Sequence, residues 1–128
     1  GFSGYVNRLN VIQNMSAVTG AMLMCKTAVY REAGGFDAEH FKIACNDVDF
    51  CLRLIERGYR NVFTPFAQAY HHESISRGYE DTPEKKARFE REKSLFQERH
   101  STYLANSDPY YNKYLLLDRE DVVPRPLD

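Results

Sequence analysis

The strongest hydrophobic period in the chain begins just after Asn46. Apolar side chains recur there at the three- and four-residue spacing of one helix face: Val48, Phe50, Cys51, Leu52, Leu54 and Ile55. Asn46 is a favoured N-cap residue, and Gly58 stands where a left-handed glycine commonly ends a helix. The pattern therefore predicts an amphipathic helix between these two residues, with one face buried.

A second, longer helix is predicted over residues 83–104. Thr82 suits the N-cap, and a proline follows at the first helical position. Most positions of this helix are charged, and its apolar positions form a narrow seam: Phe89, Leu95, Phe96 and Tyr103. Such a seam indicates packing against the body of the domain or against a second copy of the chain. The helix is therefore a candidate for contacts in a homo-oligomer.

Shorter runs predict a few strands beside these helices. The run at 18–25 is small and then apolar, which is typical of a buried strand. Two further short strands are predicted at 59–64 and 67–72, separated by Pro65. The sequence thus predicts an α/β fold in which few strands pack with helices.

A short helix is predicted at 28–33, after the first strand. Thr27 is its candidate N-cap, and Gly34 with Gly35 marks its end. The whole chain, 1–128, is expected to form one domain, with a peripheral loop and a surface tail at its ends: 1–17 and 105–128.

Composition limits the class of protein. The 128 residues suit one domain, and the formal net charge of −1 gives no reason to expect nucleic acid as a partner. No apolar run approaches the roughly 18 residues of a membrane span. The start at Gly1 shows neither an initiating methionine nor a signal peptide, so we expect the chain to be a piece of a longer protein.

The three cysteines predict neither a disulfide framework nor a zinc site. They form an odd set without CxxC spacing, as expected for reduced thiols. A zinc site made by Cys45, Cys51, His71 and His72 fits the residue types. Its spacing matches no standard site, and the two cysteines would diverge on a helix, so we disfavour it.

Two carboxylates stand at the start of the predicted central helix. Asp47 and Asp49 both suit the first turn, where the partial positive charge of the helix end favours anions. Asp49 also has Arg53 at i+4, the spacing of a helix-surface ion pair. Asp47 has no such partner and faces the packed side, where an acid is either costly or useful. Residues i and i+2 point about 200° apart on a helix, so the two carboxylates are not expected to chelate one cation together.

Two further segments carry candidate chemistry. His71 and His72 end a predicted strand, so one of them would face a cleft or serve the structure alone. The polar loop that follows contains Arg77 and suits either the handling of an anion or a simple connection. Three small residues in the first predicted strand permit close approach of a ligand or close internal packing: Thr19, Gly20 and Ala21.

Taken in order, these motifs resemble glycosyltransferase family 2. The matching segments are VTGA at 18–21, GGFD at 34–37, NDVDFCLR at 46–53, GYR at 58–60, YHHES at 70–74 and SRG at 76–78. They are similar to the C-terminal half of the family's GT-A catalytic domain, in the bacterial branch that builds polysaccharides such as O-antigen. The resemblance implies a partial GT-A fold with a long C-terminal helix.

The resemblance also implies roles for individual residues. Asp47 matches the second acid of a Glu-Asp pair, which supplies the family's catalytic base, and Asn46 replaces the first acid. His71, with His72 as the alternative, matches a ligand of Mg²⁺ or Mn²⁺. Arg77 would contact the diphosphate. The remaining implied residues lie near the acceptor or support the site: Thr19, Gly20, Ala21, Asn46, Asp49 and Arg53.

The implied reaction is an inverting, metal-assisted transfer of a sugar, of hexosyltransferase type. The donor would be a nucleotide-diphosphate sugar and the acceptor a saccharide or a lipid-linked glycan, in a cytoplasmic or membrane-peripheral enzyme. The family's nucleotide-binding half precedes the matched region, so the isolated chain is expected to be inactive. The alternative is a non-catalytic interaction module built on the same scaffold.

Overall fold

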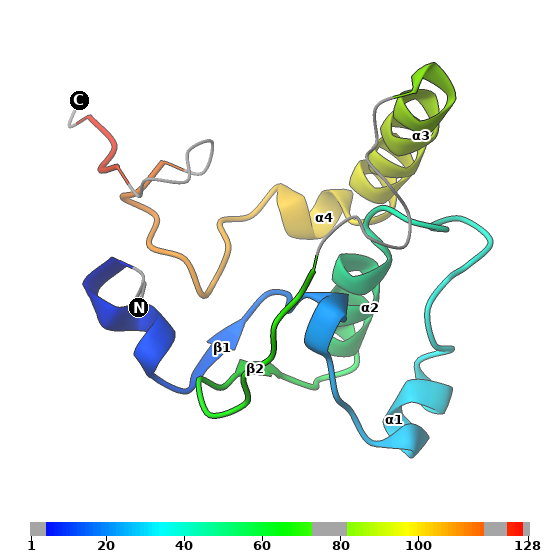
Figure 1. Ribbon diagram of the computed structural model, residues 1–128. Coiled ribbons are helices and arrows are strands. Elements are labelled where there is room, and N and C mark those ends of the chain that lie inside the picture. Colours follow the sequence, from blue (N-terminus) through cyan, green and yellow to red (C-terminus); the bar gives the residue numbers. More distant parts are fainter. Residues whose placement is uncertain (1–4, 73–81, 117–122, 127–128) are drawn as a thin grey trace.

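The structure is a computed structural model that describes residues 5–72, 82–116 and 123–126. Its elements, in chain order, are the 3-10 helix η1 (Tyr5–Asn10), strand β1 (Gln13–Met15), the 3-10 helix η2 (Gly20–Met22), helices α1 (Thr27–Glu32) and α2 (Asn46–Glu56), strand β2 (Asn61–Phe63), and helices α3 (Pro83–Arg99) and α4 (Ser101–Leu104) (Figure 1). This mixture of helices and a small sheet is compatible with the predicted α/β class.

Helix α2 is the centre of the fold, as its apolar period predicts. Its buried residues are Asp49, Phe50, Cys51, Leu52 and Leu54. Gly58 adopts a φ of +82°, so the predicted glycine end is confirmed. The predicted N-cap is wrong: Asn46 is the first helical residue, and Cys45 occupies the cap position with a left-handed φ of +62°. A residue that is itself helical cannot act as the N-cap, because the cap needs non-helical backbone.

The sheet has two antiparallel strands. β1 pairs with β2 in the register Gln13 to Phe63, Asn14 to Val62 and Met15 to Asn61. The predicted strand at 59–64 is confirmed over its centre, but its partner comes from the N-terminal segment, where the sequence predicts a peripheral loop.

The strands predicted at 18–25 and 67–72 are wrong. The first contains the η2 turn and leaves Met24 97% exposed, and the second is an exposed irregular segment. The only sheet in the described part of the chain is the β1–β2 pair. A strand needs a hydrogen-bonding neighbour, and apolar composition does not supply one.

Helix α1 packs beside α2 and ends at Glu32, one residue before the predicted bound and ahead of the two predicted glycines. Gly34 and Gly35 both have left-handed φ values, +79° and +65°. The start differs by one residue, because the helix begins at Thr27 and Lys26 occupies the cap position. The two helices share an apolar cluster whose members are Ala33, Phe50 and Leu54, with Leu23 and Val29 packed against it.

Helix α3 begins as predicted but does not continue to residue 104. Thr82 Oγ1 accepts a hydrogen bond of 3.3 Å from the Lys85 N–H, and Pro83 occupies the first turn. The helix breaks at His100, whose φ and ψ of −103° and 22° separate α3 from α4. His100 is 2% exposed, and its Nε2 lies 2.9 Å from Asp49 Oδ1, so a buried contact coincides with the break.

The apolar seam of α3 and α4 packs against the body of the same chain. Phe96 lies against Phe41, with ring centroids 6.4 Å apart, and Tyr103 donates a 2.8 Å hydrogen bond to Ser16 Oγ. Phe89 is 41% exposed. Packing against the body, one of the two predicted uses of the seam, is therefore confirmed, and self-association stays a prediction.

The tail after α4 lies on the same side as the N-terminal segment (Figure 1). Asp108 Oδ1 accepts a 2.6 Å hydrogen bond from Ser16, and the Arg8 guanidinium lies 5.7 Å from the centroid of the Tyr111 ring. Across the described ranges, no helix has the length and apolarity needed to cross a membrane.

Candidate functional site

Asp47 lies in the first turn of α2 and is half-buried. Its Oδ2 accepts a 2.7 Å hydrogen bond from the Gly20 N–H, and its Oδ1 accepts one of 2.9 Å from the Val48 N–H. Each carboxylate oxygen has two lone pairs, so each retains one acceptor position. The sequence leaves Asp47 without a partner, and the structure supplies one from a segment 27 residues earlier.

Gly20 lets η2 approach Asp47 closely. A Cβ added at Gly20 would lie 3.1 Å from Asp47 Cβ, closer than side chains normally pack. Close internal packing is found at Gly20, whereas Thr19, Gly20 and Ala21 are all exposed, so the binding of a ligand by this segment stays a prediction. Thr19 Oγ1 accepts a 3.3 Å hydrogen bond from the Ala21 N–H and thereby stabilises the turn.

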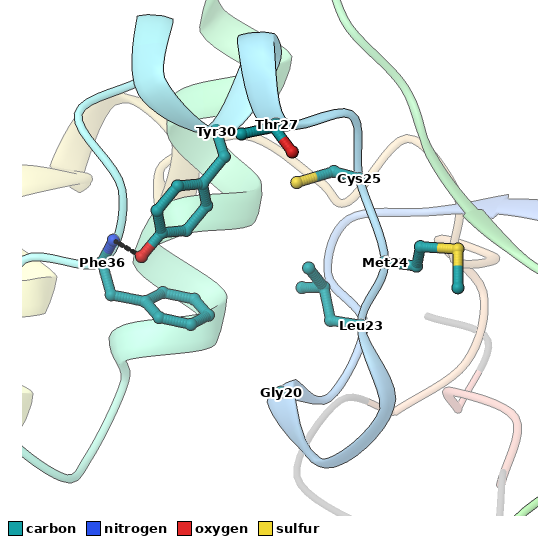
Figure 2. A pocket seen from close by; sticks show the side chains of 7 residues that line it. All are labelled: Gly20, Leu23, Met24, Cys25, Thr27, Tyr30 and Phe36. Atoms are coloured by element: carbon teal, nitrogen blue, oxygen red, sulfur yellow. Dashed lines mark hydrogen bonds between the residues drawn. The ribbon is translucent and has the colours of Figure 1, made fainter.

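Gly20 also lines an open pocket of about 340 Å³ (Figure 2). It is lined by Gly20, Leu23, Met24, Cys25, Thr27, Tyr30 and Phe36. Gly20 thus belongs both to the pocket wall and to the hydrogen bond with Asp47. The wall is mostly apolar, with a few polar groups, which is the usual composition of a small-molecule site.

The aromatic side of the pocket is built from the glycine end of α1. The Tyr30 ring packs over Gly35, where an added Cβ would come within 2.8 Å of the ring. The Phe36 N–H donates a 3.2 Å hydrogen bond to Tyr30 Oη, drawn in Figure 2. Both rings also pack against Phe50 of α2, with centroids 5.4 and 5.3 Å away. The aromatic wall is therefore attached to the helix that carries Asp47.

Asp49 is the centre of a buried charge cluster on the other side of α2. The predicted i,i+4 ion pair is confirmed, with Arg53 Nε 2.8 Å from Asp49 Oδ2. It is not on the surface, however, because Asp49 is 0% exposed. His100 Nε2 and Arg99 Nη1 also donate to Oδ1, at 2.9 and 3.1 Å.

These hydrogen-bond donors favour the ionised form of Asp49. Burial opposes ionisation and raises its pKa, but the hydrogen bonds from His100, Arg53 and Arg99 outweigh burial and hold the pKa below its ordinary value. Arg53 also donates to the backbone oxygens of Ala33 and Gly35, which join α2 to the end of α1. Asp49 and Arg53 thus support the fold around the first turn of α2.

Cys45 and Cys51 offer no reactive thiolate near Asp47. Burial raises the pKa of Cys45, and the carboxylates of Glu92, Asp47 and Asp49 raise it further. Burial likewise raises the pKa of Cys51. Both thiols therefore stay protonated at neutral pH, which disfavours nucleophilic or metal-binding sulfur here.

The predicted metal ligands do not make a complete site among the described residues. His71 and His72 are exposed at the end of the segment after β2, and Arg77 lies outside the described residues. No group of three or more His, Cys, Asp or Glu side chains positioned to hold a cation occurs within residues 5–72, 82–116 and 123–126. One imidazole does not meet the octahedral, oxygen-rich coordination that Mg²⁺ requires.

Comparison with known proteins gives several partial matches. The chain is 47% identical over 121 residues to an uncharacterized protein of Sinorhizobium fredii, covering 94% of this chain and 13% of that relative. It is 34% identical over 110 residues to the O-antigen biosynthesis protein RfbC of Myxococcus xanthus, covering 85% of this chain and 8% of that relative. It is 33% identical over 61 residues to an N-acetylglucosaminyl-diphospho-decaprenol L-rhamnosyltransferase of Mycobacterium tuberculosis, covering 48% of this chain and 20% of that relative.

The matches support a glycosyltransferase-like origin for this chain, because the last of these relatives is named for sugar transfer and RfbC for O-antigen synthesis. The chain spans only 13% and 8% of the first two relatives. No protein-family profile matches it, and no solved structure does.

Proposed function

We propose that this chain is the acceptor-side part of a family 2 glycosyltransferase of GT-A type, and that Asp47 is its catalytic base. The observation that carries the proposal is the hydrogen bond to Asp47 from Gly20, a residue that also lines an open pocket. The names of the relatives support the class of reaction.

In the proposed reaction, a hydroxyl of the acceptor binds to a free lone pair of the Asp47 carboxylate. The carboxylate takes the hydroxyl proton as that oxygen forms a bond to the anomeric carbon of the donor sugar. The bond from this carbon to the diphosphate oxygen breaks at the same time, and the nucleoside diphosphate leaves with the electron pair. Attack opposite the leaving group inverts the anomeric configuration.

The acceptor is proposed to lie in the pocket shared with Gly20. Its apolar wall suits the C–H face of a sugar ring or the carrier of a lipid-linked glycan. Tyr30 Oη accepts its hydrogen bond from Phe36, so the hydroxyl proton is available to a ligand.

We also propose that a divalent cation assists the departure of the diphosphate. His71, or His72 in its place, would supply one ligand to Mg²⁺ or Mn²⁺, and Arg77 would contact the diphosphate. When bound, the cation would neutralise charge on the departing diphosphate. The described residues supply no complete set of ligands for this cation.

Replacing Gly20 with alanine should disturb the site more than the fold. The new Cβ would lie 3.1 Å from Asp47 Cβ, so the Asp47 side chain must move by a few tenths of an ångström. A misplacement of about 1 Å at a reacting group costs up to about 10²-fold, so we expect this smaller shift to lower kcat by up to about 10-fold, with little change in Tm. The comparison is steady-state kinetics and thermal unfolding of the enzyme that contains this chain. Ala87→Ser serves as the control, because Ala87 is exposed on α3 and does not line the pocket. Full turnover in Gly20→Ala would argue against the proposed site.

A further inference from the structure

Glu92 is a buried carboxylate on a helix whose other charged residues are mostly exposed. It is 5% exposed, and its Oε2 accepts hydrogen bonds from two successive backbone amides, Ile43 N–H at 3.3 Å and Ala44 N–H at 2.6 Å. Burying a carboxylate costs free energy unless hydrogen bonds offset the lost hydration. The two amides are therefore specific partners of this side chain.

These amides belong to the turn that leads into α2. The next residue, Cys45, has a left-handed φ of +62°, and the helix begins immediately after it. A non-glycine residue keeps this conformation only where the surroundings hold it. Glu92 contacts the two residues before Cys45, so it stabilises the turn that sets where the helix begins.

Helix α3 also contacts α2 after Asp47. Arg99, its last residue, and the adjoining His100 donate to Asp49 Oδ1 at 3.1 and 2.9 Å. Hydrogen bonds from Glu92 and His100 thus hold the chain on both sides of Asp47, at residues 43–44 before it and at Asp49 after it. Its own contact is with Gly20, on a different part of the chain. The position of the Asp47 carboxylate relative to Gly20 consequently depends on the contacts that α3 and His100 make with residues 43–49.

The buried face of α2 has a separate support. Phe50 and Leu54 pack with Ala33 in the apolar cluster, and Glu92 is not part of this cluster. Loss of the Glu92 contact should therefore release the start of α2 while the rest of the helix stays packed.

We propose that Glu92 is a positioning residue, which fixes the turn at residues 43–45 and thereby aligns the Asp47 carboxylate against Gly20. The expected effect of Glu92 on turnover rests on the proposed function. The expected effect of Glu92 on the contact between Asp47 and Gly20 is independent of that function.

The first test is structural and uses the 128-residue chain. The Gly20 N–H donates a 2.7 Å hydrogen bond to the Asp47 carboxylate, so its amide proton resonance should lie downfield. Asp47→Ala removes the acceptor and should move this resonance upfield. In Glu92→Ala we expect the same upfield shift. Glu92→Gln should preserve the downfield position, because a single amide oxygen can accept the two hydrogen bonds that Oε2 accepts now.

The second test is kinetic and uses the enzyme that contains this chain. Glu92→Ala should lower kcat by about 10²-fold with little change in KM, because a misplaced base slows chemistry without weakening binding. Glu92→Gln should restore kcat. Glu90→Ala is the matched control, since Glu90 lies on the same helix with 66% of its side chain exposed.

A further variant covers the case in which Glu92→Ala does not fold. Glu92→Asp keeps the charge but withdraws the carboxylate by one methylene, so it should reproduce the upfield Gly20 resonance and the lower kcat. A folded Ala or Asp variant with the wild-type Gly20 resonance and kcat would overturn the role of Glu92. So would a Gln variant that behaves like Ala. If Asp47→Asn instead retains full turnover, the proposed function fails, and the Gly20 resonance alone still decides the role of Glu92.

Discussion

Replacing Asp47 with asparagine is expected to lower kcat by about 10²–10⁴-fold, the usual contribution of a general base. Asparagine has nearly the same shape, and its amide oxygen can still accept the Gly20 N–H. An amide cannot take the proton of an acceptor hydroxyl at neutral pH. The variant should therefore fold and bind the acceptor but transfer sugar very slowly.

The measurement is steady-state turnover together with thermal unfolding of the enzyme that contains this chain. Glu39→Gln is the matched control, because it removes one negative charge from an exposed residue in the loop before α2. We expect this control to keep the wild-type kcat and Tm. Wild-type kcat in Asp47→Asn would show that the base is misassigned. A large fall in Tm would instead assign Asp47 a structural role through its contact with Gly20.

The sequence predicts those parts of the fold that short-range signals determine. The spacing of apolar residues marks α2, the threonine and proline at 82 and 83 mark the start of α3, and glycines mark the ends of α1 and α2. Each signal acts within about one helical turn, so it does not depend on the rest of the chain.

The strands were harder to predict because pairing is a long-range property. The run at 18–25 has strand-like composition but contains the η2 turn, whereas β1 has the polar sequence QNM. β1 is a strand because β2, almost 50 residues away, pairs with it. Composition alone carries no information about which segments meet.

The candidate site shows the same division. The Asp49–Arg53 pair spans one turn and follows from spacing, whereas the Asp47–Gly20 contact spans 27 residues and the Asp49–His100 contact spans 51. The resemblance draws attention to Asp47 and Gly20 separately, but nothing in the sequence joins them. Nor does the charged pattern of residues 83–104 reveal that Glu92 and His100 are buried.

Replacing Asp49 with asparagine is expected to lower the free energy of unfolding by about 3–5 kcal/mol, as is typical when one partner of a buried ion pair is removed. Asp49 is fully buried, and the guanidinium groups of Arg53 and Arg99 would lose the negative charge that they now share. Urea unfolding of the two proteins at pH 7 measures this difference. The control is Glu90→Gln, whose exposed pairing with Lys93 at 3.9 Å should contribute less than about 1 kcal/mol.

The dependence of stability on pH distinguishes the loss of the Asp49 charge from a packing defect. Burial raises the pKa of Asp49, but its hydrogen bonds hold the folded pKa below the unfolded value of about 3.9. The ionised Asp49 therefore stabilises the fold above that pH, and its contribution is lost as the pH falls through the folded pKa. The two proteins should thus differ most near neutral pH and converge in acid. Burial also raises the pKa of Asp37, but its hydrogen bonds, chiefly the one from Arg99, lower that pKa overall. The Asp49→Asn variant keeps Asp37, so its stability should still fall in acid, but by less than that of the wild type. A difference that stays constant from pH 7 to pH 3 would mean that Asp49 acts through its shape and not through its charge.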